Sequence, residues 1–221
     1  MHWIDPAYLP ETKGNLDRFL INPHGAADGL LLRDGKEVHF PPHMSKAIVA
    51  AASVGDMISV RGVRPRGVNM IAAVSIQVGT ETPIVDHGPP NAEHDELKRD
   101  HEKAEKMATP ESGRSADTEG LIMHVLHGPR GEKRGALLDN GIMVRMPPHV
   151  AAAMREKLSP EHRLAARGRS LTNALGTVID AREIGVSLSA LHALEPDKGW
   201  ERDGRKSPGR DDKARKAATA I

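Results

Sequence analysis

Two histidines end the same short motif, Val-x-x-Pro-Pro-His, once at His43 and again at His149. A functional interpretation puts both histidines where a strand meets a helix, near the opening of a barrel. A structural interpretation is equally simple. Pro-Pro ends a strand because proline cannot donate to a β-ladder, and a histidine before a helix can bond to its free backbone amides. The role of this repeated motif therefore stays open at this level.

Histidine is also a metal ligand, and the chain contains 12 of them. His24, His39 and His43 could form a ligand set in the first half of the chain. The second half has Arg130 and Arg145 at the positions of His24 and His39, and arginine does not bind metals. Imidazole sites need three or four convergent ligands. We therefore predict neither a metal site nor a cofactor, and a histidine-dependent metal-binding protein is the third of our three hypotheses.

Basic residues gather at corresponding places in both halves of the chain. They could follow a phosphate backbone, or they could be the ordinary charges of a polar surface. The candidates for nucleic-acid binding are Arg61, Arg64, Arg66, Arg130, Lys133, Arg134, Arg145, Arg167 and Arg169.

Aromatic side chains, on which single-stranded bases usually stack, are scarce. Phe19 and Phe40 have Val125 and Met146 as their counterparts, and residues 120–187 contain no aromatic residue. Binding of nucleic acid would thus rest on charge and hydrogen bonding, and would be weak and sensitive to salt. The two phenylalanines are more simply explained as core residues.

The chain lacks the motifs of common enzymes. We find no phosphate-binding loop with lysine, no Gly-x-Ser-x-Gly and no His-Glu-x-x-His. The paired carboxylates Asp95 and Glu96 stand in a polar stretch where no pocket would shift their pKa values. We expect a protein that is not an enzyme.

The bulk composition is that of an ordinary globular protein with an uneven charge distribution. The 221 residues include no cysteine, and the formal net charge is +1. Residues 79–119 hold five Lys/Arg against eleven Asp/Glu, a net charge of −6, between two mildly basic halves. The sequence has no apolar stretch of about 20 residues, and we expect no secretory signal, because its first residues do not show a basic region followed by an apolar run. We expect a cytoplasmic protein without a membrane partner.

The chain repeats itself at an offset of 106 residues. The copies share Gly and Pro residues in register and a turn pair, which is Asp34-Gly35 in one copy and Asn140-Gly141 in the other. Such pairs between apolar runs predict β-hairpins. Strands are predicted at residues 15–22, 29–33, 37–40, 55–62 and 68–78, with Ala-rich helices at 44–53 and 150–159.

The order β-β-β-α-β-β, with a Gly-Asp-x-apolar-x-apolar-x-Gly fourth strand at 55–62, resembles the OB-fold, a five-stranded Greek-key barrel. An SH3-like barrel with a helical insertion is the alternative. The predicted organisation is a mainly β protein with two tandem OB-like barrels. Its parts are an N-terminal arm (1–13), barrel 1 (14–78), an acidic flexible linker (79–119), barrel 2 (120–187) and a disordered, mildly basic tail (188–221).

The OB-like pattern and the repeated arginines favour a non-catalytic protein that binds nucleic acid, most simply a single strand. The scarcity of aromatic residues and the acidic linker favour the alternative, an adaptor that binds another protein.

Overall fold

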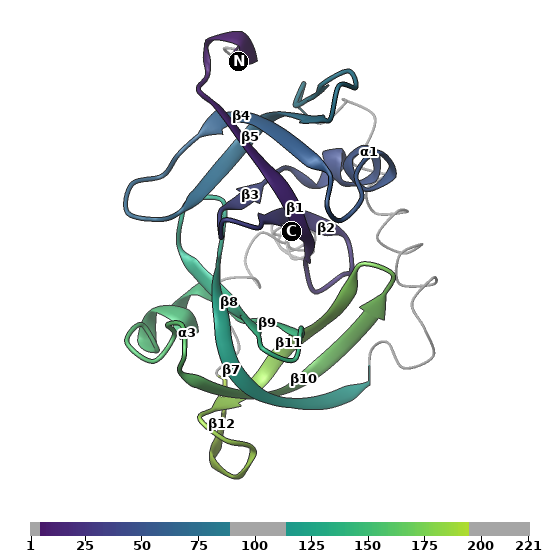
Figure 1. Cartoon of the computed structure of the whole chain (residues 1–221). Coiled ribbons are helices and arrows are strands. Elements are labelled where there is room, and N and C mark those ends of the chain that lie inside the picture. Colours follow the sequence, from purple (N-terminus) through teal and green to yellow (C-terminus); the bar gives the residue numbers. More distant parts are fainter. Residues whose placement is uncertain (1–4, 89–113, 195–221) are drawn as a thin grey trace, which may run out of the picture.

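The computed structural model describes residues 5–88 and 114–194, which form two β-barrels packed against each other (Figure 1). The elements of the first barrel are η1 (Pro6–Tyr8), β1 (Glu11–Ile21), β2 (Ala27–Leu32), β3 (Glu37–His39), η2 (Pro42–Met44), α1 (Ser45–Ala51), β4 (Met57–Val63), β5 (Met70–Val78) and β6 (Ile84–Val85). Those of the second are β7 (Ser115–His127), β8 (Lys133–Leu138), β9 (Met143–Arg145), α3 (Pro148–Ala153), β10 (Arg163–Asn173), β11 (Gly176–Gly185), η3 (Leu188–Ala190) and β12 (Leu191–Ala193).

Both barrels close in the same way. In the first, the strand order β3-β2-β1-β4-β5 is closed by parallel pairing of β3 with β5. In the second, β9-β8-β7-β10-β11 is closed by parallel pairing of β9 with β11. This Greek-key closure, with a helix between the third and fourth strands, is that of the OB-fold. The predicted fold class is confirmed, and the topology decides against an SH3-like barrel.

The Asp-Gly and Asn-Gly turns have the backbone conformation that the sequence predicts. Gly35 and Gly141 have φ values of +78° and +81°, a region that glycine enters without steric cost. The helices are shorter than predicted. The helix predicted at 150–159 begins two residues earlier, at Pro148, because proline suits the first helical position, and it ends at Ala153.

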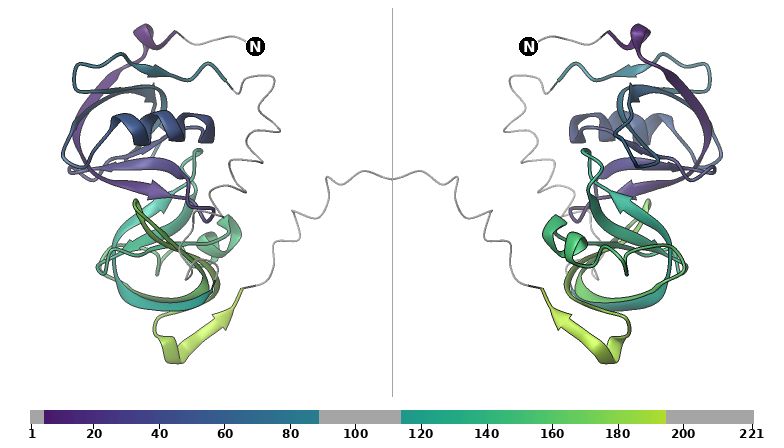
Figure 2. Two further views of the ribbon diagram at one scale, coloured as in Figure 1. Left: turned by 90° about the vertical axis from the view of Figure 1, so that its right-hand side faces the viewer. Right: turned by 90° about the vertical axis from the view of Figure 1, so that its left-hand side faces the viewer.

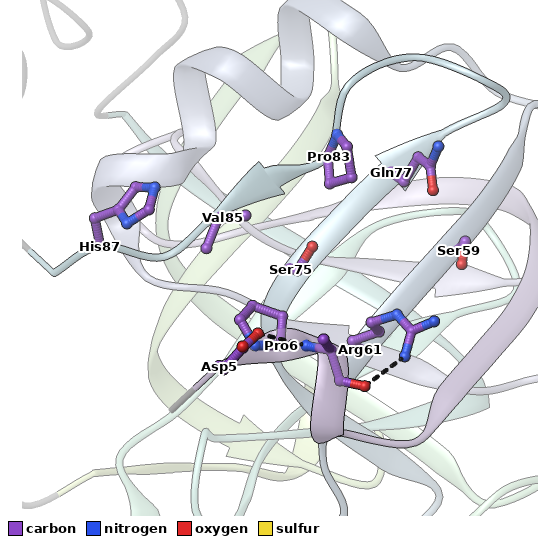
Figure 3. Close-up of a pocket in the computed structure, with 10 residues that line it drawn as sticks. Asp5, Pro6, Ser59, Arg61, Ser75, Gln77, Pro83, Val85 and His87 are labelled. Carbon is purple, nitrogen blue, oxygen red and sulfur yellow. Dashed lines mark hydrogen bonds between the residues drawn. The ribbon is translucent and has the colours of Figure 1, made fainter. Parts of the chain in front are cut away.

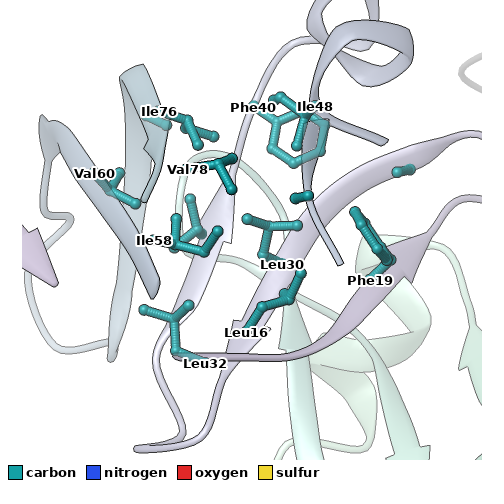
Figure 4. Packing of buried hydrophobic residues seen from close by; sticks show 14 of the residues in the cluster. Leu16, Phe19, Leu30, Leu32, Phe40, Ile48, Ile58, Val60, Ile76 and Val78 are labelled. Atoms are coloured by element: carbon teal, nitrogen blue, oxygen red, sulfur yellow. The ribbon is translucent and has the colours of Figure 1, made fainter. Parts of the chain in front are cut away.

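Each barrel encloses its own apolar core. In the first, Leu16, Leu30 and Ile58 are fully buried, and Phe19 and Phe40 lie in the same cluster (Figure 4). Burying a side chain of this size stabilises a fold by about 1.5–3 kcal/mol. In the second, Val125 and Met146 occupy the positions of the two phenylalanines and are likewise buried. The prediction that Phe19 and Phe40 are core residues is confirmed.

The strand-four Arg-Gly pair marks a β-bulge in both copies. The register of β4 with β5 shifts between Arg61 and Gly62, and that of β10 with β11 shifts between Arg167 and Gly168. A Cβ atom at Gly62 would lie 2.2 Å from the carbonyl oxygen of Ala72, so no larger residue fits there. The repeated glycine is therefore explained by the barrel itself.

The strands extend beyond the repeat limits taken from the sequence. β1 and β7 begin before Gly14 and Gly120, because β1 pairs with β4 and β7 with β10 along these extra residues. β6 lies in the segment predicted to be a linker, and β12 in the segment predicted to be a tail. The predictions for 89–113 and 195–221 lie outside the described residues. Among the residues that the structure describes, no helix is long and apolar enough to cross a membrane.

A third apolar cluster joins the two barrels. Its residues come from the outer faces of strands in both: Leu20, Ile21, Leu31, Leu126, Leu137, Met143, Leu171 and Val178. Leu20 corresponds to Leu126 and Leu31 to Leu137 in the repeat, so each barrel presents the same face to the other. Figure 2 shows the resulting stack from two sides. The two copies are thus related by an approximate two-fold axis through this cluster.

Candidate nucleic-acid interface

Two loops from different barrels meet at one edge of the inter-barrel contact. The β4–β5 loop of the first barrel packs on the β7–β8 loop of the second, at the left of Figure 1. A Cβ atom at Gly131 would lie 3.1 Å from Val68 Cγ2 and 3.3 Å from Pro65 Cβ. Gly131 has a φ of +85°, so glycine allows both the turn and the close approach. We call this contact the basic junction, because arginines flank it on both loops.

Four of the predicted arginines belong to the basic junction. Arg64 and Arg66 stand on the β4–β5 loop, and both are exposed. Arg130 and Arg134 stand on and just after the β7–β8 loop, also exposed. Arg64 donates a hydrogen bond to the Thr12 hydroxyl, which holds its side chain against β1. The contact of the two loops thus brings arginines of both barrels to the same edge of the molecule.

An acidic side chain partly neutralises the positive charge of the basic junction. Glu132 lies 3.2 Å from the Arg134 guanidinium and accepts a hydrogen bond from the backbone N–H of Arg130 at 3.1 Å. It orders the β7–β8 loop while offsetting part of its positive charge. The basic junction is thus moderately positive, and its field is easily screened by salt.

Lys133 makes hydrogen bonds within its own barrel. Its Nζ donates hydrogen bonds to the carbonyl oxygens of Arg155 and Leu158, at 3.0 and 2.6 Å. Burial and the nearby charge of Arg155 lower the pKa of Lys133. The amine therefore closes the turn that follows α3 and is not part of the basic junction.

Arg145 is buried between the barrels, with 5% of its surface exposed. Its Nε donates to the carbonyl oxygen of Ile21 at 3.1 Å, and its Nη2 lies 2.8 Å from an Asp28 oxygen. This position corrects the sequence prediction, since a guanidinium committed to two inter-barrel partners presents no face to a nucleic acid. Arg145, on the third strand of its barrel, faces the other barrel instead of a ligand.

The repeated pair Arg61 and Arg167 lies on the strands, away from the basic junction. Arg167 is held by Asp117 through two bonds of 2.8 and 3.0 Å and by Glu183 at 3.0 Å. The hydrogen bond and charge of Asp117 raise the pKa of Arg167. Arg169 lies further along β10 on an exposed face, opposite Asp180 in the strand register. The structure therefore does not bring these three to the loop surface.

The opposite edge of the contact has the same construction without the excess of arginines, because Asp28 stands at the repeat position of Arg134 and pairs with Arg145. There Gly25 of the β1–β2 loop packs on Leu171 and Asn173 of the β10–β11 hairpin, at the right of Figure 1. Asn173 Nδ2 donates to the carbonyl oxygen of Gly25 at 2.8 Å. We call this contact the neutral junction.

A buried carboxylate lies at the centre of the contact. Glu37, with 1% of its surface exposed, accepts hydrogen bonds from His124 Nε2 (3.0 Å), from His127 Nδ1 (2.6 Å) and from the backbone N–H of His127 (3.0 Å). His39 Nε2 lies 3.5 Å from the same carboxylate and has no other bond. Burial raises the pKa of Glu37, but the hydrogen bonds from His124 and His127 outweigh it and hold the pKa far below 4.5.

Sequence reasoning missed Glu37 and its histidine partners. Glu37 has the alternation of an ordinary strand residue, and its counterpart in the second copy is Met143. The exchange of Glu for Met at corresponding strand positions was the signal that the sequence offered. Without the docking of the barrels, nothing links Glu37 to His124, which lies 87 residues away.

The two histidines of the Pro-Pro-His motif differ in their surroundings. His43 Nε2 lies 2.9 Å from Asp86, just after β6. His149 is exposed in the first turn of α3. Neither caps a helix. Within 5–88 and 114–194, no group of three or more His, Asp or Glu residues is arranged to hold a metal ion.

No protein-family model matches the chain, and no curated protein sequence is significantly similar to it. Among solved structures, the chain is similar to the single-stranded DNA binding protein from Thermus aquaticus. A deletion mutant of that protein matches with 14% identity and a TM-score of 0.25, over 85% of this chain and 96% of that one. The wild-type protein matches with 15% identity and a TM-score of 0.24, over 90% and 95%. Superpositions this loose say nothing about a ligand.

Proposed function

We propose that this protein is a non-catalytic binding protein that holds single-stranded nucleic acid weakly, through the basic junction. The observation that carries the proposal is the contact of the β4–β5 and β7–β8 loops, which gathers Arg64, Arg66, Arg130 and Arg134 from two barrels. In an OB-fold, the loops between strands 1 and 2 and between strands 4 and 5 are the ones that border the ligand. Here one of each kind forms a single surface.

The buried surfaces support a mode of binding that depends on charge rather than on stacking. Phe19 and Phe40 are 6% and 5% exposed and offer no platform for a base. The face of strands 2 and 3, which OB-folds commonly use, is covered in each barrel by the other one. A strand of nucleic acid would therefore contact the protein through its phosphates, without strong preference for sequence.

The salt dependence of binding tests this proposal. A labelled single-stranded oligonucleotide titrated with the full chain should show binding at about 50 mM salt, with a slope of log K against log salt of about −3 for four arginine contacts. Arg66→Ala and Arg130→Ala should each reduce the slope by about 0.7. Asn173→Ala at the neutral junction is the matched control and should leave the slope unchanged.

Two results would reject the proposal. The first is an absence of binding at the lower salt concentration. The second is a slope that Arg66→Ala and Arg130→Ala leave as it was, because the contacts would then lie elsewhere on the molecule.

The second candidate function is a protein-binding adaptor. It is favoured by the scarcity of aromatic side chains on which bases could stack, since Phe19 and Phe40 are buried in the core. An adaptor would retain a protein partner after nuclease treatment, and Arg66→Ala would not affect that retention. The comparison of both assays separates the two functions.

A further inference from the structure

A cavity of about 430 Å³ lies beside Arg61, on the outer face of the first barrel (Figure 3). Its floor is formed by β4 and β5 with Ser59, Arg61, Ser75 and Gln77. The η1 turn borders it on one side, and the segment around β6 borders it on the other. Polar side chains thus converge with one guanidinium in a bounded space, away from the basic junction.

The repeat supplies a direct comparison for this cavity. In the first barrel, Arg61 is flanked in the strand register by Glu11 on β1 and Ser75 on β5. In the second barrel, the same positions around Arg167 are Asp117 on β7 and Glu183 on β11. The two sites differ in chemical type at the residue on the following strand, where the first barrel has the Ser75 hydroxyl and the second has the Glu183 carboxylate.

The guanidinium of the second barrel is saturated by its own chain. Asp117 binds Arg167 through two bonds, and Glu183 Oε2 lies 3.0 Å from its Nη1. Two carboxylates thus face one cation, an arrangement that guanidinium geometry favours.

The guanidinium of the first barrel has weaker partners. Its nearest carboxylate, Glu11, lies 3.8 Å away, and the same Glu11 oxygen already accepts the Ser59 hydroxyl at 2.6 Å. Arg61 Nη1 donates instead to the carbonyl oxygens of Leu9 and Ala7, at 3.1 and 3.4 Å. These carbonyls orient the side chain without neutralising its charge.

We propose that the Arg61 cavity binds a carboxylate carried on a short aliphatic arm, in the place that Glu183 fills in the second barrel. The ligand oxygen would meet the Arg61 guanidinium, and the Ser75 hydroxyl can donate to it where Glu183 stands in the other copy. Pro6, Pro83 and Val85 give the cavity apolar walls for the aliphatic arm.

The charge around the cavity favours a monoanion. The Asp5 carboxylate also borders the cavity and accepts a hydrogen bond from the backbone N–H of Ala7 at 2.9 Å. Together with Glu11, 3.8 Å from Arg61, it outweighs the single guanidinium charge, and this net repulsion is about twice as large for a phosphate dianion as for a carboxylate, since Coulomb energy scales with charge. The ligand chemistry is therefore that of a glutamate side chain, whether in a peptide or in a free acid.

A matched pair of probes tests this proposal. The full-length, isotope-labelled protein is titrated with N-acetyl-glutamate amide and, separately, with its neutral isostere N-acetyl-glutamine amide. We expect saturable NMR shifts at Arg61, Ser75 and Gln77 with the first probe, with a Kd of about 1–10 mM, and none with the second. Arg61→Gln should weaken binding by about tenfold or more. Glutarate in place of the peptide probe distinguishes a free acid from a peptide ligand.

A substitution that copies the second barrel provides an independent test. Ser75→Glu should place a carboxylate on Arg61 and abolish the response, while Ser75→Gln should retain part of it. Equal responses to both probes, or a response that Arg61→Gln does not weaken, would overturn the proposal. Substitutions at Arg66 and Arg130 should not affect these shifts, so the carboxylate site and the nucleic-acid proposal can fail separately.

Discussion

The two junctions between the barrels have the same backbone construction and opposite chemistry. At each, a glycine of the loop after the first strand, Gly131 or Gly25, meets the hairpin after the fourth strand of the other barrel. One junction is flanked by four arginines, and the other is closed by the amide of Asn173. The repeat therefore conserves what lets the barrels dock, and it varies what the docked surface offers to a ligand.

At the centre of the contact, too, some residues are the same in both copies and others differ. Leu20 and Leu31 in one copy have Leu126 and Leu137 in the other, and all four are in the shared apolar cluster. Glu37 and Met143, by contrast, break the symmetry with a charge on one side and a thioether on the other. The two halves of the contact thus use different polar partners, with Glu37 bound to His127 in one half and Arg145 bound to Asp28 in the other.

The largest effect is expected from making this centre symmetric. Glu37→Met should lower the free energy of unfolding by about 3–5 kcal/mol, because the donors of His124 and His127 lose their buried partner. Met143→Leu, at the corresponding position, should cost less than about 1.5 kcal/mol, because it conserves volume. Urea unfolding measures both, and equal losses would contradict the role given to the carboxylate.

The contribution of Glu37 should depend on pH in a defined direction. Its pKa in the folded protein is lower than the ordinary value of 4.5, so the unfolded chain binds the proton more readily. The stability that it contributes is then complete above about pH 4.5 and is lost as the pH falls below that value. The difference in unfolding free energy between the wild type and Glu37→Gln should shrink on acidification in urea titrations. A difference that stays constant from pH 7 to pH 3 would argue against this cause.

The two junction glycines should respond unequally to a methyl group. Gly25 and Gly131 have nearly the same φ, +86° and +85°, so alanine at either costs about 1–2 kcal/mol of backbone strain. The added carbon meets Leu171 Cδ2 at 2.7 Å in the first case and Val68 Cγ2 at 3.1 Å in the second. Gly25→Ala should therefore be the more destabilising of the two in thermal unfolding.

Gly67→Ala separates the strain from the contact. This residue has a φ of +78°, and a Cβ atom there would have no neighbour within 4 Å. It should show the strain alone. If Gly25→Ala lowers the melting temperature no more than Gly67→Ala does, the neutral junction accommodates the added methyl group without cost.

The smallest effect is expected at the neutral junction itself. Asn173→Ala removes the hydrogen bond to the Gly25 carbonyl oxygen and should cost about 1 kcal/mol in unfolding free energy. Oligonucleotide binding should be unchanged. A change in binding would show that the two junctions are not functionally distinct.

The barrels could be predicted from local sequence, and the contact between them could not. Asp34-Gly35 and Asn140-Gly141 predict hairpins because turn chemistry acts between neighbours in the chain. Arg145 was predicted to face a ligand because an exposed strand residue and a strand residue covered by another domain have the same local pattern. Its partners Ile21 and Asp28 are more than 100 residues away, and only the docked structure brings them together.

The approximate two-fold axis also has a consequence for association between separate molecules of this protein. Each barrel carries a face that fits a copy of itself, so identical barrels from separate molecules compete with the pairing inside one chain. The covalent connection gives the internal partner an effective concentration of about millimolar. Sequence differences add a penalty, because Arg134 stands at the repeat position of Asp28, so two second barrels would set Arg145 against an arginine. Charges that differ between the two copies of a duplicated face can thus favour pairing within one chain over pairing between chains.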